Sequence, residues 1–262
     1  MKIRLLIAIA FWTSVAAAAD WQAELSPPTP GKFPMLKPLQ ASYRFGWGGL
    51  SAAEGTFEFS RPKPGLLQLQ VNARSLGAAR ALWRMDSQHT ATCVEATLRP
   101  VSLQQIEAYK KRTLTITADF SPEGVTRLQK VHPAEKAEAK AKRFKAPNLF
   151  DLHTALLFVR SQSLQPGERH HLIVYPGKAP FLAKVTVLAR EKLKLGGKVH
   201  DAIKMEVALQ RVTKDLQLEK HEKFKRASAW LSDDQDRLLL KIESEIFVGS
   251  VWAELQSVKF AE

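Results

Sequence analysis

The sequence predicts a mainly β protein, an antiparallel curved sheet or barrel with one buried helix near residues 149–161. Several short runs alternate apolar and polar residues with a period of two, which places one set of side chains inward and the other toward water. Turn signals with Gly or Pro separate these runs, whereas one segment has the length and composition of a helix. Many short strands joined by tight turns are typical of antiparallel meanders that curl or close.

The alternating runs continue through most of the chain, and turn signals lie between them. The clearest runs are LLQLQVNA at 66–73, TLTITADF at 113–120, FLAKVTVLA at 181–189 and AIKMEVAL at 202–209, and the turn signals are PKPG at 62–65, SPEG at 121–124, YPGK at 175–178 and LGGK at 195–198. We expect each run to form a strand of the curved sheet.

The segment PNLFDLHTALLFVRSQSL at 147–164 predicts the helix. Asn148 is the expected N-cap, with Asp151 in the first turn. The apolar side chains nearly encircle the helix axis, which is typical of a buried helix. We therefore expect this helix to pack into the concave side of the sheet, with Leu156 among its most buried residues.

Two polar residues of the helix, His153 and Arg160, form a candidate binding site. They are seven residues apart and therefore lie on one face of the helix. A buried guanidinium keeps its charge and needs a partner. Arg160 is expected either to pair with an acid of a facing strand, such as Glu206 or Glu243, or to point into a wet cavity that an anionic ligand can enter. A plainer alternative is that both side chains reach the rim of the sheet.

The acidic run SDDQD at 232–236 predicts a turn between two strands. Strand-like runs flank it, and Asp and Ser favour turns because their side chains bond nearby backbone N–H groups. A calcium loop needs a longer ladder of ligands that includes a Gly, and this run lacks both. Catalysis by Asp233 paired with Asp234 is disfavoured, because neighbouring residues on a turn diverge and nothing apolar is at hand to raise one pKa.

Three stretches of the chain resemble a known bacterial family. AWLSDDQDRLLLKIESEIFVGSVWAEL at 229–255 resembles the carboxy-terminal signature of the exported family called domain of unknown function 3108, and ASYRFGWGGLSAAEGTFEF at 41–59 and LFDLHTALLFVRSQSLQPGE at 149–168 also match. Asp151, Arg160 and Gly167 fall on the motif, whereas Leu239 stands where such sequences often have Pro. The resemblance covers residues 41–257. It implies an exported β-rich domain of the Gram-negative envelope and brings no established reaction.

The amino terminus predicts export. Residues 1–19 combine Lys2 and Arg4 with a short apolar run and a stretch of small residues, which is typical of a secretory signal peptide. A Pro-rich lead-in segment at 20–40 and a single β-rich domain at 41–262 follow. We expect the mature protein in the periplasm, with no transmembrane segment after signal cleavage, because no other stretch is apolar enough to span a bilayer.

The charge of the chain favours anionic partners. It has 39 basic and 26 acidic residues, a formal net charge of +13 that falls to +11 once Lys2 and Arg4 are removed with the signal. Such a charge attracts lipid headgroups, acidic glycans or nucleic acid, and export argues against nucleic acid. An anionic envelope lipid or another hydrophobic ligand is the expected partner, although a solvated basic surface also explains the charge.

The sequence predicts no catalytic residue, no metal site and no cofactor. None of the seven histidines occurs in an H-x-x-x-H or H-E-x-x-H pattern, and His170 and His171 point to opposite faces of a strand. No G-x-S-x-G elbow is present, and the glycines of FGWGGL at 45–50 favour a hairpin bend over a phosphate loop. Cys93 is the single cysteine and is expected as a small half-buried residue.

Binding is therefore the predicted function. Trp47, Trp230 and Trp252 lie in strand-like runs and are candidates, together with His153 and Arg160, for lining a hydrophobic ligand pocket. Ordinary core packing is the other explanation of the tryptophans. We expect a non-enzymatic periplasmic protein that binds a lipid or another hydrophobic ligand, or that takes part in envelope assembly.

An enzyme is the alternative prediction. In that case the chain is a hydrolase that acts on envelope glycan or lipid through Asp233, Asp234 or His153. An open cleft that unites His153 with carboxylates favours the enzyme, whereas an enclosed apolar site favours a carrier.

Overall fold

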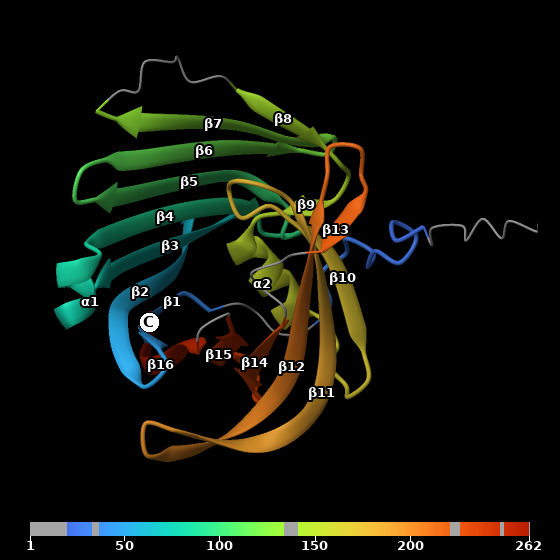
Figure 1. Ribbon diagram of the computed structural model, residues 1–262. Coiled ribbons are helices and arrows are strands. Elements are labelled where there is room, and N and C mark those ends of the chain that lie inside the picture. Colours follow the sequence, from blue (N-terminus) through green and yellow to red (C-terminus); the bar gives the residue numbers. More distant parts are fainter. Residues whose placement is uncertain (1–19, 33–36, 134–140, 221–225, 247–248, 262) are drawn as a thin grey trace, which may run out of the picture.

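One curled sheet of sixteen strands and two short helices make up the fold. Figure 1 shows the sheet wrapping around helix α2, which lies on its concave side. The predicted signal peptide at 1–19 lies outside the described residues. The computed structural model describes residues 20–32, 37–133, 141–220, 226–246 and 249–261.

The strands are 2 to 15 residues long, and the longest pair forms the β11–β12 hairpin. In chain order the elements are β1 Leu39–Trp47, β2 Leu50–Lys63, β3 Leu66–Ser75, α1 Gly77–Leu82, β4 Met85–Val94, β5 Pro100–Tyr109, β6 Thr113–Ser121, β7 Gly124–His132, β8 Lys142–Lys145, β9 Leu149–Phe150, α2 Leu152–Ser161, β10 Arg169–Val174, β11 Phe181–Leu195, β12 Lys198–Val212, β13 Leu218–Lys220, β14 Arg226–Ser232, β15 Leu239–Glu245 and β16 Ser250–Phe260.

The sheet curls without closing. Its strand order is β8-β7-β6-β5-β4-β3-β2-β1-β16-β15-β14-β12-β11-β10-β9, and β13 pairs with β12 beside this path. Adjacent strands are antiparallel, except that β9 runs parallel to β10. β8 and β9 are therefore the two edges. The predicted curved antiparallel sheet is confirmed, in its open form.

The predicted strands and turns appear because each local pattern agrees with the sheet. The four clearest alternating runs lie within β3, β6, β11 and β12. Gly196 and Gly197 join β11 to β12 with φ of +56° and +78°, which is the backbone of a two-residue hairpin turn that favours Gly at both positions. Sequence alternation and turn chemistry thus set the pairing register together.

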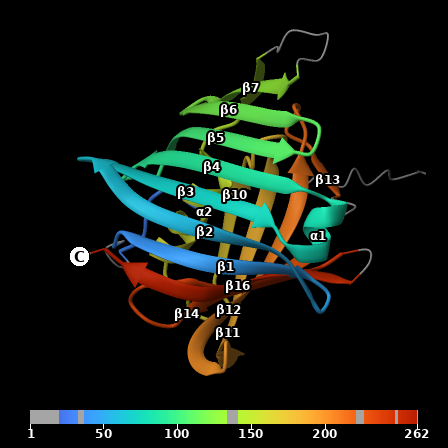
Figure 2. The ribbon, with the colours of Figure 1, turned by 90° about the vertical axis from the view of Figure 1, so that its left-hand side faces the viewer.

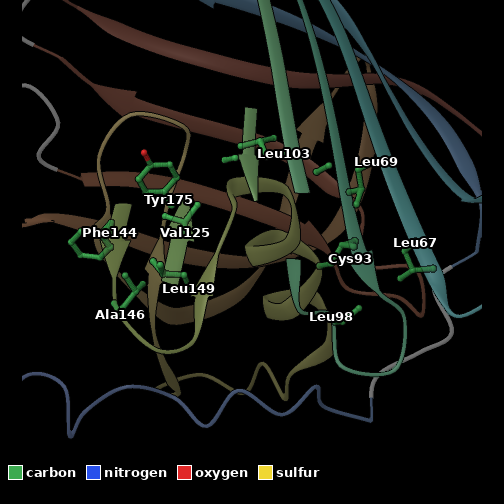
Figure 3. Close-up of a cluster of buried hydrophobic side chains, with 14 of the residues drawn as sticks. Leu67, Leu69, Cys93, Leu98, Leu103, Val125, Phe144, Ala146, Leu149 and Tyr175 are labelled. Carbon is green, nitrogen blue, oxygen red and sulfur yellow. The ribbon is translucent and has the colours of Figure 1, made fainter. Parts of the chain in front are cut away.

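The main core fills one end of the concave side. β3, β4 and β5 contribute Leu67, Leu69, Cys93 and Leu103, each with at most 1% of its surface exposed (Figure 3). Period-two alternation places these residues on one face of the sheet. Cys93 was expected to be half-buried and is fully buried instead. Burial raises the pKa of its thiol to about 12, so the thiol stays protonated.

The helix begins later than the sequence predicts. Residues 149–150 form β9 beside β10, and α2 starts at Leu152. Asp151, not Asn148, is the N-cap: its carboxylate accepts hydrogen bonds from the backbone N–H groups of His153 at 2.8 Å and Thr154 at 3.1 Å. Asn148 instead adopts a φ of +57° and accepts a hydrogen bond from Arg99. The pairing of β9 requires extended backbone here, which delays the helix.

The burial of α2 also differs in detail from the prediction. The helix lies on the concave side as expected, but Leu156 is only half-buried. Leu157 and Phe158 are its fully buried apolar residues, and Leu152 is 55% exposed. Leu157 packs into the main core and Phe158 into a second cluster formed with β10 to β12 and β14. The helix thus lies between two apolar clusters. The side of the helix that carries Leu152 and Leu156 is not fully covered by the sheet.

The SDDQD run forms the predicted turn between β14 and β15. The Asp234 carboxylate accepts hydrogen bonds from the Ser232 hydroxyl at 2.7 Å and from the backbone N–H groups of Asp236 at 2.9 Å and Arg237 at 3.0 Å. The Ser232 hydroxyl in turn accepts from the backbone N–H of Leu238 at 2.8 Å. Side-chain bonds to the local backbone therefore build the turn, as sequence chemistry predicts.

The same turn grips the carboxy-terminal end of α2. Arg160 donates from Nη2 to the carbonyl oxygen of Asp236 at 2.7 Å. Arg237 donates from Nη1 to the carbonyl oxygens of Arg160, at 3.0 Å, and Gln162. We call residues 232–237 together with Arg160 the helix clasp. It satisfies backbone carbonyls at the end of the helix that lack partners within the helix.

The Pro-rich lead-in packs onto the domain. Trp21 and Leu25 lie against the main core, and the Trp21 indole N–H donates to the carbonyl oxygen of Leu216 at 3.0 Å. The backbone N–H of Gly31 donates to the Ser161 hydroxyl at the end of α2 at 3.1 Å. A Cβ at Gly31 would lie 2.0 Å from the Ser161 carbonyl oxygen, so this approach requires glycine.

We predict that Asp234→Ala destabilises the protein more than Asp233→Ala. Asp234 accepts three hydrogen bonds within the turn, and their loss is expected to cost about 1–3 kcal/mol. Asp233 makes a partly exposed ion pair with Arg190, which is worth about 0–1 kcal/mol. Urea unfolding of the two variants checks this difference, and equal costs would contradict the turn geometry.

We predict that Leu157→Ala lowers the free energy of unfolding by about 2–5 kcal/mol, because it opens a cavity in the main core. Leu152→Ala on the same helix is the matched control. Its side chain is 55% exposed, so a change within about 0.5 kcal/mol is expected. Equilibrium denaturation measures both, and a small effect of Leu157→Ala would show that α2 is not needed for the core.

Candidate functional site

The part of the concave face beyond the main core mixes apolar and polar side chains. Residues of β2 to β6 that pair across the sheet form one row here, which we call the inner row. Its members Phe57, Val71 and His89 remain partly exposed, whereas the neighbouring row, Phe59, Leu69, Ala91, Leu103 and Ala118, is at most 2% exposed. The inner row is Phe57, Val71, His89, Gln105 and Ile116.

His153 of α2 faces the inner row. Its ring lies edge-on to His89 with 5.6 Å between ring centroids, and 6.3 Å from the ring of Phe57. Only 8% of His153 is exposed, and its Nε2 atom has no hydrogen-bond partner among the described residues. The Asp151 cap positions this residue, because it fixes the first turn of the helix.

Both imidazole rings are held neutral. Burial lowers the pKa of His153 to about 4. Burial also lowers the pKa of His89 to about 4, with a further contribution from His153 that the Glu107 carboxylate opposes. Two neutral rings present donors and acceptors without charge. The site is therefore suited to hydroxyl, carbonyl or ester groups.

Sequence reasoning missed the polar residues that surround His89. The Ser87 hydroxyl lies 3.1 Å from His89 Nε2, and the Tyr109 hydroxyl donates to Glu107 at 2.5 Å. The buried Gln105 donates from Nε2 to the carbonyl oxygen of Pro176 at 3.0 Å. The alternation of the run DSQHTATC at 86–93 contains a signal for this site, since it places His89 on the same face as the fully buried Cys93.

Arg160 is anchored within the protein. The expected acids do not meet it: Glu206 pairs with Arg226 at 3.1 Å, and Glu243 pairs with Lys241 at 3.1 Å. Its Nη2 instead reaches a backbone carbonyl in the helix clasp. The expectation that Arg160 pairs with Glu206 or Glu243 was therefore wrong. Sequence patterns do not reveal a backbone carbonyl as the partner of a side chain. Burial lowers the pKa of Arg160, while Tyr43 and the clasp acids oppose this shift.

The three candidate tryptophans do not gather around His153. Trp47 is 51% exposed at the end of β1. Trp252 donates from its indole N–H to the carbonyl oxygen of Gly48 at 2.7 Å and covers Gly46. Trp230 alternates with Ala229 and Leu231, whose side chains belong to the cluster beside α2, so it lies on the other face of β14.

A groove of about 800 Å³ lies on the outer face of the same strands. Most of its side chains alternate with those of the inner row, and its two acids are paired, Glu54 with Arg74 at 2.6 Å and Asp86 with Arg80 at 2.8 Å. Its exposed polar groups are free to bind water, in contrast to the buried His153 nitrogen. We therefore take the inner row as the candidate site. The outer groove is lined chiefly by Ser42, Arg44, Thr56, Asn72, Arg74 and Gln88.

The described part of the chain shows neither a cluster of metal ligands nor a membrane-spanning helix. It contains no group of three or more His, Cys, Asp or Glu side chains placed to hold a metal ion. None of its helices is long and apolar enough to cross a membrane.

Comparison with family models decides the classification of the chain. Residues 42–256 match the model described as protein of unknown function (DUF3108). The chain belongs to the DUF3108 family. The resemblance seen in the sequence is thereby confirmed, and no curated protein matches this DUF3108 chain.

Three solved structures are similar to the chain at low sequence identity. A β-barrel-like protein of domain of unknown function DUF1849 from Brucella abortus is 12% identical with a TM-score of 0.54, covering 87% of the DUF3108 chain and 99% of its own. A protein from Bacteroides fragilis described as exported, with a YmcC-like fold, is 7% identical (TM-score 0.36, coverage 88% and 99%). A protein from Parabacteroides distasonis described as a lipoprotein is 6% identical (TM-score 0.35, coverage 88% and 99%). The first likeness shows a β-barrel-like fold.

Three motif residues of this DUF3108 chain hold the two ends of helix α2. Asp151 caps the start of α2, and Arg160 and Asp234 belong to the clasp at its end. Their bonds fix how far α2 reaches into the curled sheet. The position of His153 opposite the inner row follows from this placement.

We predict that the free energy of unfolding falls as the pH drops from about 6.5 to about 4. Over this range the unfolded histidines bind protons while the folded rings of His89 and His153 stay neutral, so unfolding takes up protons. A depression of this size corresponds to about 3 kcal/mol for one ring. His153→Gln should flatten the profile measured by urea unfolding between pH 7.5 and 4.5. An identical slope in the variant and the wild type would contradict the assignment.

Proposed function

We propose that this DUF3108 protein is a non-enzymatic binding protein that holds a lipid, or another hydrophobic ligand with a polar group, against the inner row. The observation that carries the proposal is the buried Nε2 of His153, which has no partner among the described residues and lies beside partly exposed Phe57 and His89. A buried polar atom left unpaired costs about 1–3 kcal/mol. A hydroxyl or carbonyl group of a ligand would satisfy it.

The rows of the concave face support an amphipathic ligand. The row nearest the main core is dry and apolar, and the inner row is mixed. The following row carries the polar residues Ser87 and Glu107, which pair across β4 and β5. A ligand lying across the strands, along the inner row, would place an apolar part near Phe57 and Val71 and a polar part near the histidines. Such sites, largely apolar with a few placed polar groups, are typical of small-molecule binding.

The geometry gives little support to the hydrolase alternative. His153 is in the first turn of α2, while Asp233 and Asp234 lie in the clasp beyond its last turn. The seven residues from His153 to Arg160 span about 10 Å along the helix. Asp233 is engaged by Arg190 at 2.8 Å, and Asp234 by the turn. A reacting group would have to contact all three residues at once, which this separation opposes.

The proposed location is the periplasm of a Gram-negative envelope. The signal-peptide pattern at 1–19 supports export. Two proteins of related structure are described as exported and as a lipoprotein, which is consistent with an envelope protein. A site that shields an apolar ligand from water suits an aqueous compartment between two membranes.

We predict that the protein purified from the periplasm carries a lipid-sized ligand that native mass spectrometry detects. Delipidated protein should bind a fluorescent fatty acid, and His153→Phe should weaken this binding about twofold to tenfold, because one hydrogen bond is worth about 0.5–1.5 kcal/mol. His200→Phe, on the β11–β12 hairpin outside the site, is the matched control and should bind as the wild type does.

Circular dichroism shows whether each variant is folded. A folded wild-type protein with no bound mass and no titratable fatty-acid binding would sink the proposal. Equal weakening by the two histidine variants would place the ligand elsewhere on the molecule.

A further inference from the structure

Exposed apolar side chains gather at one end of the sheet. Ten large hydrophobic side chains stand out as exposed in the described part of the chain, and half of them lie at this end. We call this end the rim. Its apolar residues are Trp47, Leu50, Leu82, Trp83 and Val251.

Strand pairing brings the rim together from distant parts of the sequence. Trp47 pairs with Val251, which joins β1 to β16. The backbone N–H of Leu76, just before α1, donates to the carbonyl oxygen of Ala52 at 2.8 Å, close to the start of β2. Figure 2 shows α1, the β1–β2 connection and the start of β16 along one edge of the sheet, at its right-hand side.

Helix α1 contributes no side chain to the hydrophobic core. None of its residues is buried. Leu82 is 90% exposed and Trp83 is 58% exposed. The Trp83 ring nevertheless stacks on the ring of Tyr109, with 6.2 Å between the ring centroids. An exposed Leu-Trp pair is unfavourable in water, and clustered exposed apolar groups mark an interaction surface.

Basic side chains surround these apolar groups. Lys110 and Lys111, in the turn between β5 and β6, are exposed and form no ion pair with any residue in the described ranges. Arg112 lies over the Tyr109 ring at 5.8 Å. Arg84 is 3.7 Å from Asp86, which also pairs with Arg80. The cations Arg80, Arg84, Lys110, Lys111 and Arg112 thus outnumber the acids Asp86 and Glu107, and the rim around α1 is positively charged.

We propose that the rim docks the protein onto the surface of an anionic phospholipid membrane. Trp and Leu side chains are suited to the boundary between headgroups and acyl chains, where Trp rings are favoured. Lys and Arg beside them attract anionic headgroups. The combination of exposed apolar side chains with basic residues around them is the chemistry of interfacial membrane binding.

The rim lies at the polar end of the inner face. Met85 and Tyr109 pair at the rim, and Ser87 and Glu107 follow them directly toward the inner row. A docked molecule would therefore turn this end of its concave face toward the lipid surface. Docking itself does not depend on the proposed ligand, so vesicle binding and fatty-acid binding are separate measurements.

Flotation with vesicles tests the docking. We expect the protein without its signal peptide to bind vesicles containing phosphatidylglycerol and to bind pure phosphatidylcholine vesicles weakly. Leu82→Ser combined with Trp83→Ser should lower the partition coefficient at least tenfold, because both side chains leave the interface. The matched control is Leu188→Ser combined with Val199→Ser, which removes two exposed apolar side chains away from the rim and should leave binding unchanged.

A second pair of variants separates the effect of the rim lysines on vesicle binding from the effect of the net charge of the protein. Lys110→Gln combined with Lys111→Gln should lower the partition coefficient about tenfold or more. Lys194→Gln combined with Lys198→Gln makes the same change of net charge at the exposed tip of the β11–β12 hairpin and should have little effect. Equal losses in the two variants would overturn the docking rim in favour of net charge alone. Absent wild-type binding to anionic vesicles would also overturn it.

Discussion

The fold depends on holding a short helix inside an open sheet at both of its ends. An α-helix leaves backbone N–H groups at its start and carbonyl groups at its end without helical partners, and burying them unpaired is costly. The fully buried Asp151 carboxylate accepts hydrogen bonds from the N–H groups at the start of the helix. Arg237 donates hydrogen bonds to the carbonyl oxygens of Arg160 and Gln162 at its end. These two capping residues, Asp151 and Arg237, are 86 residues apart in the sequence, so the helix and the sheet position each other.

The placement of α2 divides the concave side into two parts with different roles. Leu157 completes the main core at one end, where the facing strands are dry. His153, one turn earlier, reaches the inner row at the point where the facing side chains become mixed and partly exposed. Beyond this row the strands end at the rim with Trp83 and its basic neighbours. The placement of α2 thus explains why the main core, the candidate site and the rim follow one another along the strands.

Sequence patterns predict local structure well here and tertiary partners poorly. Alternation predicts β3, β6, β11 and β12, and the side-chain chemistry of SDDQD predicts its turn. The N-cap shifts from Asn148 to Asp151 because β9 competes for the preceding residues. The partner of Arg160 is a backbone carbonyl, which leaves no mark in the sequence. Trp230 looks like a pocket residue by spacing, but the side of the sheet it occupies is decided only by the register of β14.

The open edges of the sheet have a mechanical consequence. In a closed barrel the strand number and stagger fix the diameter, whereas here no ladder joins β8 to β9. The two edge strands are instead linked by residues 146–148, and Phe144, Ala146 and Leu149 pack in the main core. The chain itself and packed side chains therefore hold the curl where a barrel would have a row of backbone hydrogen bonds. Three exposed cations in β8, Lys142, Arg143 and Lys145, discourage pairing with another sheet, and β9 is only two residues long. The two edges of the open sheet are thus tied to each other by a short stretch of chain and resist pairing with another molecule.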